Sequence, residues 1–194
     1  MDEKRFMFYS HDGLGLGHVR RNLAIAAALV EAATDASVLV VTGSEEIDRL
    51  GIAPHVDVVK LPGLRKLGNE RYAPRRLPGS DAAILDLRSA QCAAAVESFR
   101  PHVMLVDKHP LGACRELRPA LDLHKALGGR AALGLRDVLD DPGTVRAEWS
   151  GSVRDAIDEY YERLLVYGSR DGLDLVDAYG LSPTARRAES FPAR

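Results

Sequence analysis

The sequence has few of the features that mark membrane-spanning, nucleic-acid-binding or disulfide-rich proteins. No apolar run approaches the roughly 18 residues of a spanning helix, and the charged residues 1–5 do not begin a secretory signal peptide. Its 26 basic residues are outnumbered by 28 acidic ones, which removes the global electrostatic case for a nucleic-acid partner. Cys92 and Cys114 lack metal-ligand spacing and are typical of reduced thiols. We therefore expect a soluble cytoplasmic protein without a metal site.

Three common motifs of nucleotide-binding proteins and hydrolases are also missing. The first glycine-rich segment reads G-x-G-x-G, whereas a dinucleotide fingerprint reads G-x-G-x-x-G, and His18 stands where its third glycine belongs. The following apolar run ends at Thr42, whereas a dinucleotide-binding fold has an acidic residue there that binds the ribose. Neither G-x-x-x-x-G-K-[ST] nor G-x-S-x-G occurs. These departures disfavour a nicotinamide or flavin enzyme, a P-loop enzyme and a serine hydrolase.

Short apolar runs alternate with helical patterns along most of the chain. We expect strands near residues 6–10, 37–42, 56–61, 102–107, 131–136 and 164–168. We expect helices from Gly17 to Val30, after Ser44, after Ser80, over 114–127 with a kink or restart at Pro119, over 145–161 and over 174–179. This order predicts an α/β fold with a doubly wound, mostly parallel, Rossmann-like sheet. The domain is predicted over residues 1–181, with 182–194 as a linker or disordered tail.

The segment from Lys60 to Pro78 interrupts this alternation. It is rich in proline and glycine and carries six basic residues against Glu70 alone. We expect a long loop, and two interpretations stay open. It is either a solvated surface loop, or a mobile lip that holds an anionic acceptor or lies on an anionic membrane surface at the inner face of the membrane.

Ligands of doubly wound sheets bind beyond the carboxyl ends of the strands, where two histidine-rich segments should converge. His18 falls in the first turn of a helix, whose dipole favours the neutral imidazole that a general base requires. Asp107 ends the fourth expected strand and is a candidate orienting partner. Alternatively, His18 makes a structural hydrogen bond at the helix start and Asp107 binds backbone N–H groups. His11 is a second candidate base.

Residues 13–24, Gly-Leu-Gly-Leu-Gly-His-Val-Arg-Arg-Asn-Leu-Ala, resemble the first loop and helix of GT-B glycosyltransferases, most closely those of the MurG-like branch and the predicted glycosyltransferases grouped with it. Residues 107–112, 135–138 and 165–168 are similar to other blocks of that predicted group. The likeness extends over residues 5–181. In this family the histidine at the place of His18 acts as the base, held by an acid at the place of Asp107.

The resemblance implies the N-terminal, acceptor-binding half of a hexosyl-type transferase. Such an enzyme uses a nucleotide sugar, here a UDP-sugar, as co-substrate, holds no tight cofactor, and transfers the sugar to a hydroxyl of a small-molecule or lipid-linked acceptor. The residues expected to contact substrate are Gly13, Gly15, Gly17, His11, Arg21, Asn22, His109, Arg136 and Asp137.

No second doubly wound pattern follows Tyr179, so we expect a truncated product or fragment that is inactive alone. Its partner would be a separately encoded donor domain or a second copy of the chain. Two alternatives remain: a non-catalytic Rossmann-like remnant or binding module, and a fragment of a sugar-nucleotide epimerase.

Overall fold

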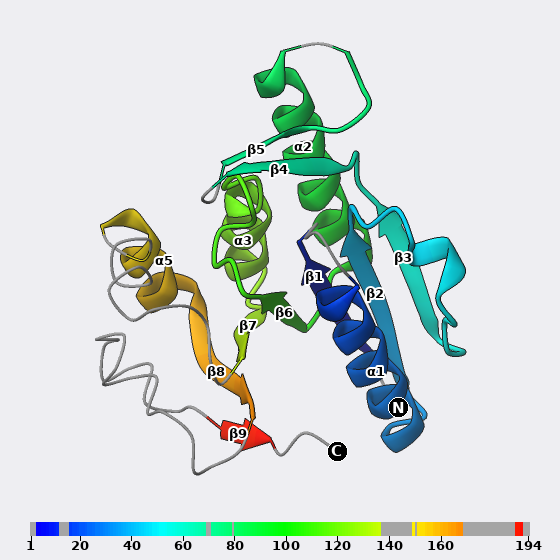
Figure 1. Ribbon diagram of the computed structural model, residues 1–194. Coiled ribbons are helices and arrows are strands. Elements are labelled where there is room, and N and C mark those ends of the chain that lie inside the picture. The colour runs from blue at the N-terminus through cyan, green and yellow to red at the C-terminus, as the bar shows by residue number, and fades with distance from the viewer. Residues whose placement is uncertain are drawn as a thin grey trace.

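A seven-stranded, entirely parallel sheet forms the centre of the protein (Figure 1). The computed structural model describes residues 3–11, 16–68, 71–78, 80–136, 149, 151–168 and 189–191. The strands of the sheet are β1 (Lys4–Ser10), β2 (Ala36–Thr42), β3 (Val56–Lys60), β6 (Val103–Asp107), β7 (Arg130–Arg136), β8 (Tyr161–Tyr167) and β9 (Glu189–Phe191). Their order across the sheet is β3-β2-β1-β6-β7-β8-β9. The predicted α/β, Rossmann-like architecture is therefore confirmed.

Helices cover both faces of the sheet. They are α1 (Gly17–Ala32), α2 (Asp81–Phe99), α3 (Arg118–Ala126) and α5 (Ser152–Tyr160), with a short 3₁₀ helix η1 (Ile47–Arg49). Successive β1 side chains alternate between the faces: Met7 and Tyr9 join the core formed with α2, α3 and α5, and Phe8 joins the core formed with α1. In the part of the chain that the structure describes, no helix is long and apolar enough to cross a membrane.

Local chemistry accounts for the starts of α2 and α3. The Ser80 hydroxyl accepts a hydrogen bond from the backbone N–H of Ala83 at 3.2 Å and caps α2, as its position predicts. Pro119 lies in the first turn of α3, where its missing N–H costs nothing, so this helix begins at Arg118 and not at residue 114. The helix expected directly after Ser44 is only the short η1, which begins after Glu46 and has no side-chain cap.

Two further boundaries differ from the expectation, and one lies outside the described residues. β8 begins at Tyr161, inside the span predicted as helix, because Tyr161 pairs with Ala131 of β7. Residues 189–191, predicted to lie in a linker or disordered tail, pair with β8 as β9. The predicted helix over 174–179 falls outside the described residues, and the domain boundary at 181 stays a prediction.

The expected loop after β3 is largely an antiparallel hairpin, so that prediction was wrong. β4 (Leu64–Gly68) pairs with β5 (Arg71–Pro74), and the hairpin crosses α2 above the ends of β1 and β2 and extends over the top of α3 (Figure 1). Leu64 and Ala73 are buried, although the sequence around them is basic and polar. The burial of these two side chains against the domain stabilises the hairpin, and the local sequence pattern does not indicate this burial.

A buried ion pair anchors the hairpin to the core. Arg88 of α2 and Glu116 have no exposed side-chain surface, and Nη2 of Arg88 lies 2.8 Å from Oε1 of Glu116. The Tyr9 hydroxyl donates to the same oxygen at 2.7 Å, and Nη1 of Arg88 donates to the Pro62 carbonyl. The Glu116 carboxylate therefore joins β1 to α2, and Arg88 extends the connection to the segment leading into the hairpin.

Candidate functional site

The central strands β1 and β6 meet at the point where the sheet reverses direction. From β1 the chain proceeds outward through β2 and β3, and from β6 it proceeds the other way through β7 and β8. Ligands of open parallel sheets bind beyond the carboxyl ends of the strands at such a point. His11 follows β1 and Asp107 ends β6 at this edge.

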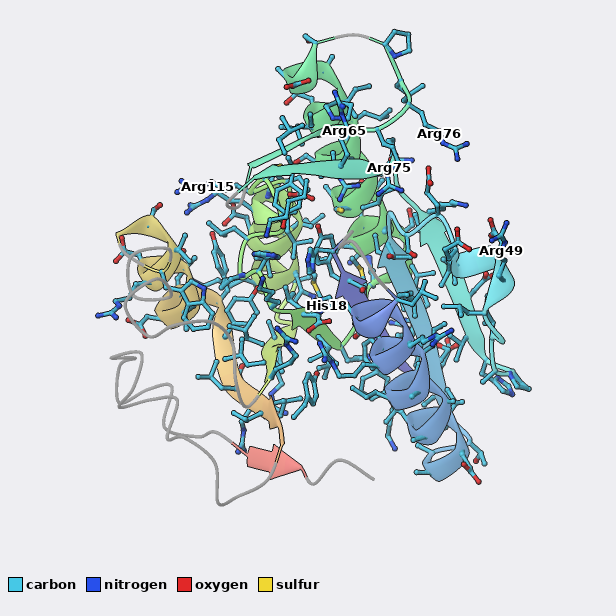
Figure 2. All side chains as sticks on the ribbon, viewed as in Figure 1. His18, Arg49, Arg65, Arg75, Arg76 and Arg115 are labelled. Carbon is cyan, nitrogen blue, oxygen red and sulfur yellow. The ribbon has the colours of Figure 1, made fainter. Side chains whose placement is uncertain are left out.

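The first two turns of α1 carry three polar side chains to Asp107. His18 Nδ1 lies 2.8 Å from Asp107 Oδ2, and Arg21 Nη2 lies 2.7 Å from Oδ1 and 2.9 Å from Oδ2. Asn22 Nδ2 donates to the same carboxylate at 3.3 Å and to the His18 carbonyl at 3.1 Å. Spacings of three and four residues place these side chains on one helix face, which is turned toward the end of β6. Figure 2 shows His18 below the hairpin, near the start of α1.

The surroundings of Asp107 keep its carboxylate ionised. Burial acts to raise the pKa of Asp107, but the hydrogen bonds and charges of His18 and Arg21 outweigh it and lower the pKa. An ionised carboxylate only accepts hydrogen bonds, so a neutral His18 ring donates to it with its proton on Nδ1, while Arg21 Nη2 lies 3.1 Å from the same nitrogen. Its Nε2 then keeps a lone pair. The His18 side chain is 20% exposed and that of Asp107 only 1%, so the imidazole is accessible and the carboxylate is enclosed.

Two more imidazoles border His18. The ring centroid of His11 lies 4.4 Å from that of His18 and 4.3 Å from that of His109, both in edge-to-face geometry. Burial, and then the charges of neighbouring basic groups, lower the pKa of His11 to about 2 and that of His109 to about 3. Both rings are therefore neutral at physiological pH. Among the described residues, Nδ1 of His11 has no hydrogen-bond partner.

A tight turn holds the end of β6. The backbone N–H of His109 donates to the Asp107 carbonyl at 2.8 Å, which closes a three-residue turn around Lys108. Lys108 has φ 63° in the left-handed region, and its N–H donates to the Gly134 carbonyl of β7 at 2.9 Å. Strained backbone of this kind concentrates at functional sites, where the surrounding structure holds it in place.

Tyr167, at the end of β8, completes the cluster from the other side. The guanidinium carbon of Arg21 lies 4.7 Å from the centroid of the Tyr167 ring. Burial, and then the Asp107 charge, raise the pKa of Tyr167 well above its usual value. Tyr167 was not among the residues predicted for the site. Its position at the carboxyl end of a predicted parallel strand is the feature of the sequence that could have indicated it.

Comparison with solved structures relates the whole arrangement to known folds. The chain is similar to a UGT transferase from Siraitia grosvenorii in complex with UDP (TM-score 0.57, 15% identity, 97% of this chain and 50% of that one). It is also similar to sucrose-phosphate synthase from Thermosynechococcus elongatus (0.58, 12%, 98% and 48%) and to MurG from Acinetobacter baumannii (0.50, 11%, 86% and 42%). No family profile and no curated protein matches the sequence.

The chain has a GT-B glycosyltransferase-like fold. It spans about half the length of each of these three structures. The likeness to this fold agrees with the resemblance that residues 13–24 predicted.

Within this GT-B-like fold, the other predicted contact residues divide into four groups. Arg21 and Asn22 direct their polar ends at Asp107, and their contact with substrate stays a prediction. Arg136 is exposed at the end of β7, beside Tyr167. Gly17 starts α1, and a Cβ built there meets nothing within 4 Å, so packing does not require glycine. Gly13, Gly15 and Asp137 lie outside the described residues.

Among the described residues no metal cluster marks the site, and two cavities are lined by other residues. Within the described ranges, no three His, Cys, Asp or Glu side chains are arranged to hold a metal ion. A cavity of about 590 Å³ lies at the opposite edge of the sheet, between α3, α5 and the starts of β7 and β8. Another of about 480 Å³ lies at the base of the hairpin, lined by Pro62, Arg76 and Gln91 among others. Neither is lined by His18 or Asp107.

Proposed function

We propose that this chain forms the acceptor side of a glycosyltransferase that moves a sugar from a nucleotide sugar to a hydroxyl acceptor. The observation that carries the proposal is the 2.8 Å contact between His18 Nδ1 and the buried Asp107 carboxylate. This pair lies at the switch point of a GT-B-like fold, where ligands of such sheets bind.

His18 acts as the general base. Its Nε2 takes the proton of the acceptor hydroxyl while the acceptor oxygen forms a bond to the anomeric carbon of the sugar. The bond between that carbon and the diphosphate oxygen breaks, and its electron pair leaves with the diphosphate. The Asp107 carboxylate stabilises the imidazolium that forms and fixes the ring orientation. Arg21 and Asn22 hold the carboxylate in place.

The donor side is supplied by residues outside 1–194, in the same polypeptide or in a separate one. The three similar structures are about twice as long as this chain, and one of them was solved in complex with UDP. A UDP-sugar is therefore the proposed donor, and residues 1–194 alone are expected to show no turnover.

The test uses the longest natural polypeptide that contains residues 1–194, with the donor protein added if it is separate. Transfer of labelled sugar from a panel of UDP-sugars to extracted metabolites and lipids is compared for the wild type and for His18→Ala. We expect a 10²- to 10⁴-fold loss, about the contribution of a general base. His55→Asn is the control, since His55 is exposed and its φ of 62° suits asparagine. Full transfer by His18→Ala contradicts the base assignment.

A further inference from the structure

Arg21 is placed to act on both members of the His18–Asp107 pair. Its Nη2 lies 2.7 Å from Oδ1 and 2.9 Å from Oδ2 of Asp107, and 3.1 Å from Nδ1 of His18. His18 and Arg21 are three residues apart on α1, so one helix turn brings the imidazole and the cation to the same carboxylate. When Nδ1 carries the ring proton, the 3.1 Å approach is between two donors that share one acceptor.

The enclosure of these groups makes their charges act strongly on one another. The Asp107 side chain is 1% exposed and that of Arg21 is 21% exposed. On its other side the Arg21 guanidinium carbon lies 4.7 Å from the centroid of the Tyr167 ring. Water and salt screen such a pair much less than a pair on the surface.

The Arg21 cation changes the effect of the Asp107 charge on the imidazole. An ionised carboxylate 2.8 Å from Nδ1 would, on its own, favour the doubly protonated imidazolium. Arg21 and Asp107 together carry no net charge, so much of that attraction is cancelled, and the nearby cation repels a second ring proton. An imidazolium has no lone pair to accept a proton, so Arg21 favours the form of His18 that a general base requires.

Other titratable groups border this trio. Among the described residues they come from four further segments: His11 after β1, Lys108 and His109 after β6, Tyr167 of β8, and Lys66 of the hairpin. Burial is the main cause that lowers the pKa of His11 to about 2 and that of His109 to about 3, and burial raises the pKa of Tyr167. Of these five groups, therefore, only the two lysines can carry charge near neutral pH, and both are retained in every variant below.

We propose that Arg21 is a positioning residue that keeps His18 neutral and ready to accept a proton, by neutralising the Asp107 carboxylate from the same helix. The inference rests on the proposed function and deepens it, since it assigns the control of protonation at the same site. It gives Arg21 a role in addition to the predicted contact with substrate. Sugar transfer then extends to a lower pH than His18 and Asp107 would allow without the cation.

The direct test follows the titration of the His18 ring in residues 1–194 by ¹H–¹⁵N NMR, with the signal assigned by its loss in His18→Ala. Arg21→Met is compared with Arg20→Met, which removes the same charge from an exposed position of the same helix. We expect Arg21→Met to raise the pH of half-protonation by about one unit or more, and Arg20→Met to change it by less than about 0.3 unit. Equal shifts, or no upward shift in Arg21→Met, overturn the proposal.

Two further variants separate charge from packing. Arg21→Gln keeps an amide donor without the charge, whereas Arg21→Lys keeps the charge without the planar guanidinium. We expect the first to titrate like Arg21→Met and the second to lie within about 0.5 unit of the wild type. Thermal melting identifies the folded variants, and Arg21→Gln carries the test if Arg21→Met melts early. A lysine variant that shifts as far as the methionine variant overturns the proposal.

Sugar transfer by the longest natural polypeptide that contains residues 1–194 gives a second measurement. The kcat/KM of Arg21→Met should fall most at acid pH and approach the wild-type value as the pH rises, because the acid limb reports protonation of the base. A loss by the same factor at every pH would indicate a merely structural role and overturn the proposal.

The outcome is separable from that of the proposed function, because the NMR titration requires no transfer. Full transfer by His18→Ala, combined with the expected shift in Arg21→Met, would refute the base and support the role of Arg21 in setting the protonation of the ring. Loss of transfer in His18→Ala without a shift in Arg21→Met would support the base and refute the role of Arg21.

Discussion

The Tyr167 ring of β8 lies against Gly134 of β7, in the space that a side chain at position 134 would fill. A Cβ built on Gly134 would collide with the Tyr167 hydroxyl and lie 2.8 Å from its Cζ. The glycine of β7 thus lets the tyrosine of β8 fold back toward Arg21, whose guanidinium it contacts. Arg21 in turn binds Asp107, so a missing side chain on one strand helps to position the acid on another.

Gly134→Ala should displace Tyr167 and destabilise the protein. Overpacking of a buried site costs about 1–3 kcal/mol, and we expect a loss of that size in the free energy of unfolding. Urea denaturation measures it. The matched control is Gly51→Ala, where a Cβ meets nothing within 4 Å and the change should stay within about 0.5 kcal/mol. Equal stabilities of the two variants would show that Tyr167 moves aside without cost.

His11 should make the stability depend on pH between about pH 6 and pH 4. Its pKa is lowered to about 2 in the folded protein, mainly by burial, whereas an unfolded histidine has a pKa near 6.5. Between these values the unfolded chain binds a proton that the folded protein does not bind. The free energy of unfolding therefore falls by about 1.4 kcal/mol for each pH unit below 6.5 on account of this residue.

The corresponding variant is His11→Gln, which does not titrate. Denaturation at a series of pH values should show a slope smaller than that of the wild type by about 1.4 kcal/mol per pH unit in this range. Parallel curves for the two proteins would mean that His11 is protonated in the folded state.

Arg88→Met should be strongly destabilising. It leaves the Glu116 carboxylate, which has no exposed surface, without its counter-charge, and such losses amount to about 3–5 kcal/mol. The control is Arg49→Met at the exposed ion pair with Glu46, where the expected loss is below about 1 kcal/mol. Adding Glu116→Gln to Arg88→Met should restore part of the stability, because the unpaired buried charge is removed. Additive losses in the double variant would contradict this account.

The His18 ring should carry its proton on Nδ1 in the wild type. Asp107 is ionised and lies 2.8 Å from that nitrogen, so the Nδ1–H form is favoured over the Nε2–H form. Two-bond ¹H–¹⁵N spectra distinguish the two tautomers. Asp107→Asn removes the negative charge and should shift the population toward Nε2–H, with a loss of sugar transfer. A wild-type ring already protonated on Nε2 would remove His18 as a base.

Much of the fold follows from local patterns in the sequence. Apolar runs such as residues 37–41 have no alternation, which is typical of strands covered on both faces, and helical patterns separate them. Together they predict a parallel, doubly wound sheet. The same order of elements places Asp107 and the segment around His18 at one edge of the sheet, and the structure brings these two residues into contact.

The hairpin and the fully buried ion pair were not predictable in this way. Residues 64–74 read as an irregular basic segment, because the burial of Leu64 and Ala73 depends on distant elements. Arg88 and Glu116 are separated by 27 residues, and each alone resembles an ordinary surface charge. Only their mutual approach in the core makes burial of both charges tolerable.

By itself, then, the sequence determined the class of fold and the edge of the sheet that carries the candidate site, and it offered Asp107 as a partner of His18, since strands, helices and their order along the chain follow from local patterns. Tertiary structure decided which side chains surround that pair. The approach of Tyr167 to Arg21, of His11 to His109, and of Tyr72 in the hairpin to His109 all join segments far apart in the chain. Such contacts depend on how the layers pack, and no local pattern encodes them.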